Sequence, residues 1–151
     1  MDDWQLAVSA RSALVGYLIG VNGNRGLLLI IDDEPGFREI LADVCSDEGF
    51  TVDVCGTAEE GIQKAFSEPP DAVLMDLTLP GLNGWQALRV LKADPRTSEI
   101  PVVIMTGHLV DTAANGPHLQ AAAVLMKLFL PMKLVETRSL STKKRQSVAF
   151  I

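Results

Sequence analysis

From Leu27 onward, short apolar runs alternate with longer segments in which apolar residues recur at helical spacing. Most of these runs are continuously apolar, which is typical of strands that are buried on both faces of a parallel sheet. Five of them are predicted as strands, at residues 27–31, 51–55, 72–75, 102–105 and 123–126.

The segments between these runs are predicted as helices. A proline suits the first turn of the first helix, and a threonine followed three residues later by a glutamate (Thr57 and Glu60) has the spacing of a capping box in the second. The predicted helices run from Pro35 to Gly49, from Thr57 to Pro69, from Asn83 past Leu91, from about Val110 to Ala121, and from Pro131 to about Leu140.

Strands that alternate with helices through short loops predict an α/β fold, here a doubly wound, five-stranded parallel sheet with helices on both faces. Residues 27–140 are expected to form this domain. Residues 1–26 lie outside the pattern as an N-terminal extension, either a short helix around 6–18 or a disordered leader, and residues 141–151 are a polar, basic tail.

Composition and charge narrow the classes of function. The chain has 151 residues, 48% of them hydrophobic, which suits one packed domain. Its 19 acidic and 13 basic residues give a net charge of −6, and this argues against binding to nucleic acid, which normally requires a basic face. The basic run at residues 143–145 is typical of a solvated tail.

The two cysteines and the apolar N-terminal stretch give information about the cellular location of the protein. Cys45 and Cys55 have no disulfide or zinc spacing, so both are expected to be reduced and buried. The stretch from Leu6 to Val21 follows acidic residues and is interrupted by Arg11, so neither a signal peptide nor a membrane span is predicted. We therefore expect a cytoplasmic protein without a membrane partner.

Polar side chains stand at the ends of four predicted strands. Asp32 and Asp33 end the first strand, Asp76 the third, Thr106 the fourth and Lys127 the fifth. In an open parallel sheet, ligands bind outside the carboxyl ends of the strands, at the point where the strand order reverses. These five side chains are therefore predicted to form one site.

Three carboxylates at one edge need a cation, because at about 4 Å and an effective dielectric near 20 each pair repels by about 4 kcal/mol. Oxygen ligands without histidine or cysteine favour Mg²⁺ over zinc. A carboxylate can then attack a phosphoryl donor, while the ammonium of Lys127 and the hydroxyl of Thr106 bind phosphoryl oxygens. A lone Asp after a strand is ordinary turn chemistry, but four strand ends of complementary chemistry favour a site.

The strand-end residues and the run from Met75 to Gly84, with its Asp-x-x-x-Pro-x-x-x-Gly loop, resemble the receiver domains of response regulators in bacterial two-component signalling. The separation of 30 positions between Asp76 and Thr106 also matches that family, and the likeness extends over residues 27–140. The resemblance implies a flavodoxin-like or CheY-like fold and a signalling phosphoacceptor, which is not an enzyme acting on a separate substrate.

The resemblance also implies a role for each site residue. Asp33 and Asp76 would bind Mg²⁺ directly, with the backbone carbonyl of Thr78 as a third ligand and Asp32 acting through water.

Asp76 would also be the phosphoacceptor, Lys127 would contact the phosphoryl group, and Thr106 would move toward it. The donor would be a histidine kinase or a histidine phosphotransfer protein, so His108 and His118 need no catalytic role.

Three positions depart from the usual pattern of that family. Leu128 follows Lys127 where the family usually has proline, and Gly107 follows Thr106 where alanine is common. The aromatic residue that usually responds to the switch threonine is replaced by Val124. Phosphoacceptance is therefore expected, whereas the usual coupling between threonine and an aromatic ring is not.

Only 24 residues follow Lys127, so we expect a stand-alone receiver that signals through a downstream protein. One alternative is a degenerate receiver that binds a partner without being phosphorylated. A second alternative, a haloacid-dehalogenase-type phosphatase, requires an aspartate two positions after its nucleophile, and Thr78 stands there.

Overall fold

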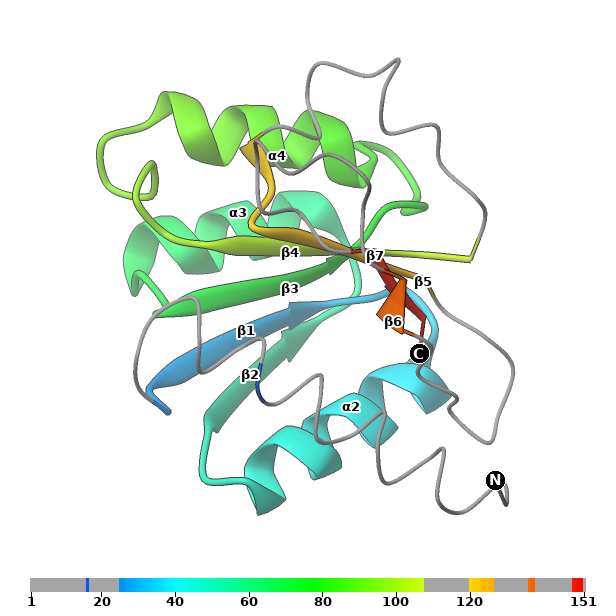
Figure 1. Ribbon diagram of the computed structural model, residues 1–151. Helices are drawn as coiled ribbons and strands as arrows, with labels where there is room; N and C mark the ends of the chain where they lie inside the picture. The colour runs from blue at the N-terminus through cyan, green and yellow to red at the C-terminus, as the bar shows by residue number, and fades with distance from the viewer. Residues whose placement is uncertain (1–15, 17–24, 108–119, 127–135, 138–147, 151) are drawn as a thin grey trace, which may run out of the picture.

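The computed structural model describes residues 16, 25–107, 120–126, 136–137 and 148–150. Its centre is a sheet of five parallel strands in the order β2-β1-β3-β4-β5 (Figure 1). This arrangement confirms the predicted α/β fold. The strands are β1 (Leu27–Ile31), β2 (Thr51–Cys55), β3 (Ala72–Asp76), β4 (Val102–Thr106) and β5 (Ala123–Met126).

Helices cover both faces of the sheet, as the continuous apolar runs predict. In Figure 1, α2 (Pro35–Asp47) lies on one face, and α3 (Ala58–Ser67) and α4 (Gly84–Ala93) lie on the other. Successive side chains of a strand point to opposite faces, so Leu28 packs on the α2 side and Leu29 on the α3 and α4 side. Every residue of β3 and β4 is buried because these two strands are central.

The N-termini of the helices are stabilised by a first-turn proline and by side-chain caps, one of which the sequence did not predict. Pro35 occupies the first turn of α2, as predicted. Thr57 caps α3, and its hydroxyl accepts the backbone N–H of Glu60 at 3.2 Å, which is one of the two bonds of the predicted capping box. The complete, reciprocal box is at α4 instead, where Asn83 and Gln86 exchange two bonds of 2.9 Å. The sequence interpretation placed a helix there but missed the box.

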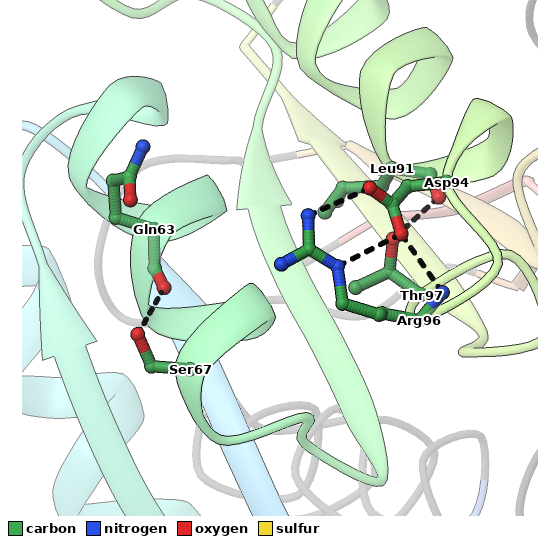
Figure 2. Close-up of polar contacts among 6 residues, drawn as sticks. All are labelled: Gln63, Ser67, Leu91, Asp94, Arg96 and Thr97. Atoms are coloured by element: carbon green, nitrogen blue, oxygen red, sulfur yellow. Dashed lines mark hydrogen bonds and ion pairs between the residues drawn. The ribbon is translucent and has the colours of Figure 1, made fainter.

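Side-chain hydrogen bonds define the turn after α4 (Figure 2). The Arg96 guanidinium donates to both carboxylate oxygens of Asp94, at 3.0 and 2.8 Å. The buried Thr97 hydroxyl donates to the carbonyl of Leu91 at 2.6 Å. At the end of α3, the Ser67 hydroxyl donates to the carbonyl four residues earlier at 2.9 Å. The bonds of Arg96 and Thr97 thus stabilise the connection from α4 toward β4.

The sheet contains two more strands than the sequence predicts. β7 (Val148–Phe150) pairs in parallel with β5, and β6 (Glu136–Thr137) pairs antiparallel with β7. The predicted helix over 131–140 is therefore wrong at residues 136–137. That segment has few apolar positions for a helix face, and the open edge of β5 offers unpaired backbone groups to any nearby extended segment.

Several predictions fall largely on residues that the structure does not describe. These are the helix around 6–18, the helix from Val110, and residues 131–135 and 138–140. At the end of the helix predicted from Val110 to Ala121, Gln120 is in a 3₁₀ turn and Ala121 is in a bend, so neither residue is in an α-helix. Both cysteines are free and buried, as expected. In the described part of the chain, no helix has the length and apolar character needed to cross a membrane.

Candidate functional site

Three acidic side chains meet at the carboxyl edge of the sheet. β1 and β3 are neighbours, with Ile31 opposite Met75, so the residues that follow Ile31 lie beside the end of β3. One carboxylate oxygen from each of Asp32, Asp33 and Asp76 lies within 4.8 Å of the other two. We call this group the acidic cluster, and it brings together all three predicted aspartates.

The backbone holds the two buried members of the acidic cluster. Asp32 is fully buried, and one of its carboxylate oxygens accepts the backbone N–H of Glu34 at 2.9 Å. Asp76 is 6% exposed, and its carboxylate accepts the N–H of Thr78 at 3.2 Å. Asp33 is exposed. The cluster therefore combines two carboxylates of fixed orientation with a third that solvent can reach.

The chemistry of the acidic cluster favours a hard cation. At 4.8 Å and an effective dielectric of about 20, two carboxylates repel each other by about 3.5 kcal/mol. Each residue offers an oxygen ligand, and no histidine or cysteine joins the cluster within the described residues. Mg²⁺ binds one or two carboxylates and keeps several waters, so these residues fit that ion.

A cationic side chain that the sequence interpretation missed lies next to the cluster. The half-buried Arg38, in the first turns of α2, donates from Nη1 to the backbone carbonyl of Asp32 at 2.9 Å. A Cβ at Gly56 would lie 3.0 Å from that same nitrogen. Arg38 therefore lies between the end of β1 and the loop that follows β2.

The loop from Leu77 to Asn83, which we call the β3–α4 loop, is closed at its base. The N–H of Gly84 donates to the carbonyl of Leu77 at 2.8 Å. A Cβ at Gly84 would lie 2.7 Å from the carbonyl oxygen of Asp76. Only glycine allows this close approach, which explains the glycine that ends the Asp-x-x-x-Pro-x-x-x-Gly motif. Thr78, the predicted carbonyl ligand, is exposed in this loop.

The remaining predicted site residues are only partly described. Thr106 ends β4, is 1% exposed and lies opposite Met126 of β5. Lys127 follows Met126 directly but is outside the described residues, as is His108. Val124 is 2% exposed and packs on the α3 and α4 side of the sheet.

Comparison with known proteins identifies the family of this chain. The family model for the response regulator receiver domain matches residues 28–138. The chain is 38% identical over 113 residues to the DNA-binding response regulator MtrA of Mycolicibacterium smegmatis. The aligned residues cover 74% of this chain and 48% of MtrA. It is also 43% identical over 79 residues to protein PilH of Pseudomonas aeruginosa, covering 52% of this chain and 65% of PilH. The chain thus spans about half the length of MtrA.

Solved structures agree with the family match. The fold is similar to that of response regulator protein TrrA from Thermotoga maritima in complex with Mg²⁺ and BeF, with a TM-score of 0.63 and 25% identity over 70% of this chain and 89% of TrrA. The five parallel strands with helices on both faces agree with this likeness. The chain therefore belongs to the response regulator receiver family, whose members are signalling domains of two-component systems.

Proposed function

We propose that this chain is a working phosphoacceptor, in which Asp76 takes a phosphoryl group from a histidine kinase or a histidine phosphotransfer protein. The observation that carries this proposal is the acidic cluster, in which three carboxylates lie within 4.8 Å of one another at the carboxyl ends of β1 and β3. A structural role for these aspartates would not require three like charges in one place.

Each member of the acidic cluster has a distinct task in this proposal. Asp33 and Asp76 would hold Mg²⁺ directly, together with the backbone carbonyl of Thr78, and the buried Asp32 would act through water. When bound, the metal would neutralise charge on the phosphoryl oxygens. The bond from Thr78 N–H to one oxygen of the Asp76 carboxylate orients that carboxylate at the end of β3.

In the transfer step, an oxygen of Asp76 forms a bond to phosphorus while the bond from phosphorus to the imidazole nitrogen of the donor breaks. The electron pair of the broken bond stays on that nitrogen. The Lys127 ammonium and the Thr106 hydroxyl bind phosphoryl oxygens and stabilise charge that develops in the transition state. The chain thereby assists its own phosphorylation without processing a separate substrate.

Partners and location follow from the same proposal. TrrA, to which this chain is similar, has been solved in complex with histidine kinase ThkA, and this supports a kinase or phosphotransfer partner here, with a downstream protein as the output. MtrA is named a DNA-binding protein, whereas the net charge of −6 supports our prediction that this chain does not itself bind nucleic acid. We place the receiver domain at residues 27–140 and the protein in the cytoplasm.

The decisive experiment is intact mass spectrometry after incubation with acetyl phosphate and Mg²⁺. We expect the wild-type chain to gain one phosphoryl group and Asp76→Asn to gain none. Asp43→Asn is a matched control, because Asp43 is exposed on α2 and outside the acidic cluster. Asp33→Ala should slow labelling by weakening Mg²⁺ binding. Full labelling of Asp76→Asn would move the acceptor to another residue.

A second candidate, a receiver that binds its partner without phosphorylation, is favoured by one observation. Val124, buried at 2% exposure, replaces the aromatic ring that the family normally places there. This candidate would be supported over the first if the wild-type chain showed no labelling and if wild type and Asp76→Asn bound the partner with equal affinity.

A further inference from the structure

We propose that Glu59 is a positioning residue for the β3–α4 loop. Its carboxylate holds the loop in the conformation that would present Asp76 and Thr78 to the metal. This inference rests on the proposed function, since it assigns a further residue to the same site. Glu59 itself touches neither Mg²⁺ nor the phosphoryl group in this proposal.

The contact joins two elements that are far apart in sequence. Glu59 Oε1 accepts the backbone N–H of Leu82 at 3.0 Å, across 23 positions of the chain. This bond is the main reason that the pKa of Glu59 is lowered from its ordinary value of 4.5. The carboxylate is therefore ionised at neutral pH and serves as a charged acceptor, which forms a stronger hydrogen bond than a neutral one.

The chain around Gly81 is shaped to admit the carboxylate. Gly81 has φ +75°, a left-handed conformation that residues with a side chain rarely adopt. A Cβ at this position would lie 2.7 Å from Glu59 Oε1. Glycine therefore meets two needs at once here, because it allows the turn and leaves space for the Glu59 carboxylate.

No other hydrogen bond ties the distal part of the loop to a neighbouring element, as far as the structure describes the chain. The base is held by the bond from Leu77 N–H to the Met105 carbonyl at 2.6 Å and by the bond from Gly84 N–H to Leu77. Within residues 78–82, the N–H of Thr78 bonds only to the adjacent Asp76, and Leu82 alone bonds to another helix. Loss of the Glu59 carboxylate would therefore remove the hydrogen bond that fixes the Leu82 side of the loop, while the base stays fixed and Leu79 remains packed in the core.

The start of α3 fixes the position of Glu59. The Thr57 cap sets where the helix begins, so Glu59 lies in its first turn, where a negative charge also interacts favourably with the helix dipole. Glu60 is the natural control, because it is the next residue, is also exposed and carries the same charge. Within the described residues, its side chain makes no hydrogen bond to the β3–α4 loop.

The test measures Mg²⁺ affinity from the emission of Trp85 in a Trp4→Phe background, with the melting temperature recorded for each variant. We expect Glu59→Ala to weaken Mg²⁺ binding by about 10-fold, in the range found when a partner of a metal ligand is removed. Glu59→Gln keeps an oxygen acceptor for Leu82 and should restore most of the affinity. Glu60→Ala and Glu60→Gln should bind Mg²⁺ as the parent does.

A second readout follows the contact itself. Amide hydrogen exchange at Leu82 should accelerate in Glu59→Ala and stay slow in Glu59→Gln. Parent-like Mg²⁺ affinity in Glu59→Ala would overturn the positioning role, and so would an equal loss of affinity in Glu60→Ala, which would indicate a general effect of charge. A parent chain that binds no Mg²⁺ would instead overturn the proposed function, whatever the Leu82 amide reports about the contact.

Discussion

The substitution Gly84→Ala tests how closely the start of α4 and the β3–α4 loop are tied to the backbone of Asp76. The added methyl group would lie 2.7 Å from the carbonyl oxygen of Asp76 and 2.8 Å from the Cα of Leu77. Both are backbone atoms and neither can rotate away, so α4 and the end of β3 must separate by several tenths of an ångström. The perturbation therefore reaches Asp76 without changing any charged group.

Two opposing effects set the magnitude of the change in stability. Inserting a methyl group into a packed site costs about 1–3 kcal/mol. Alanine is favoured over glycine in a helix by up to about 1 kcal/mol, and by less at the first residue, which Gly84 occupies in α4. The packing cost is larger, so we expect a net loss of about 1–2 kcal/mol in the free energy of unfolding.

Urea unfolding with parallel Mg²⁺ titration measures both consequences. A loss of 2 kcal/mol lowers the urea midpoint by about 1 M when the m-value is about 2 kcal/mol/M. Weaker Mg²⁺ binding should accompany it, because Asp76 moves. Gly36→Ala is the matched control: Gly36 is exposed in α2, and nothing lies within 4 Å of a Cβ there. That variant should be more stable than the parent by about 0.5–1 kcal/mol.

The comparison of the two variants can refute the reasoning. If Gly84→Ala matches Gly36→Ala in stability and the parent in Mg²⁺ affinity, the close approach of α4 to Asp76 does not constrain the site. A loss of stability with unchanged Mg²⁺ affinity would mean that the strain is absorbed by α4 alone.

Two further predictions concern titratable groups. Burial raises the pKa of the Cys55 thiol from 9.0 to about 11, so at pH 8 the thiolate is about 100-fold scarcer than in an exposed cysteine. In a Cys45→Ala background, a thiol reagent should therefore label the chain only after urea has unfolded it. Rapid labelling of the native protein would contradict this prediction. Hydrogen bonds from Arg96 lower the pKa of Asp94 from 3.8 to about 2, so this pair stabilises the fold above about pH 4 and loses its effect as the pH falls through 2. Measured by NMR, the Asp94 pKa should return toward its ordinary value in Arg96→Gln, and an unchanged value would show that Arg96 is not the cause.

The acidic cluster could be predicted from sequence because two simple rules place it. Continuous apolar runs mark buried parallel strands, and the carboxyl ends of such strands meet at one edge of the sheet. Asp32 and Asp76 each follow such a run directly, and Asp33 is the next residue after Asp32, so no knowledge of tertiary contacts was needed to bring them together. The same rules predicted the five parallel strands and the helices on both faces.

The contacts that support the site could not be predicted in this way. The bond from Glu59 to Leu82 and the bond from Arg38 to the Asp32 carbonyl join segments through the shapes of two loops, and neither leaves a periodic signal. β6 and β7 were missed for a related reason. A strand of two or three residues forms because a neighbouring edge is open, so the decisive information lies in β5 and not in the segment itself.

The pairing of β7 with β5 changes what each edge of the sheet presents to other molecules. Among the described residues, β5 has hydrogen-bonded neighbours on both sides, and the outermost strand on that side is the two-residue β6, which includes Glu136. At the opposite edge, β2 carries the ion pair of Asp53 with Lys64 at 3.1 Å. A short strand and a charged strand are both poor templates for adding a strand from another chain. Both ends of the sheet are thus protected against edge-to-edge aggregation, and β5 would become an open edge if residues 148–150 were removed.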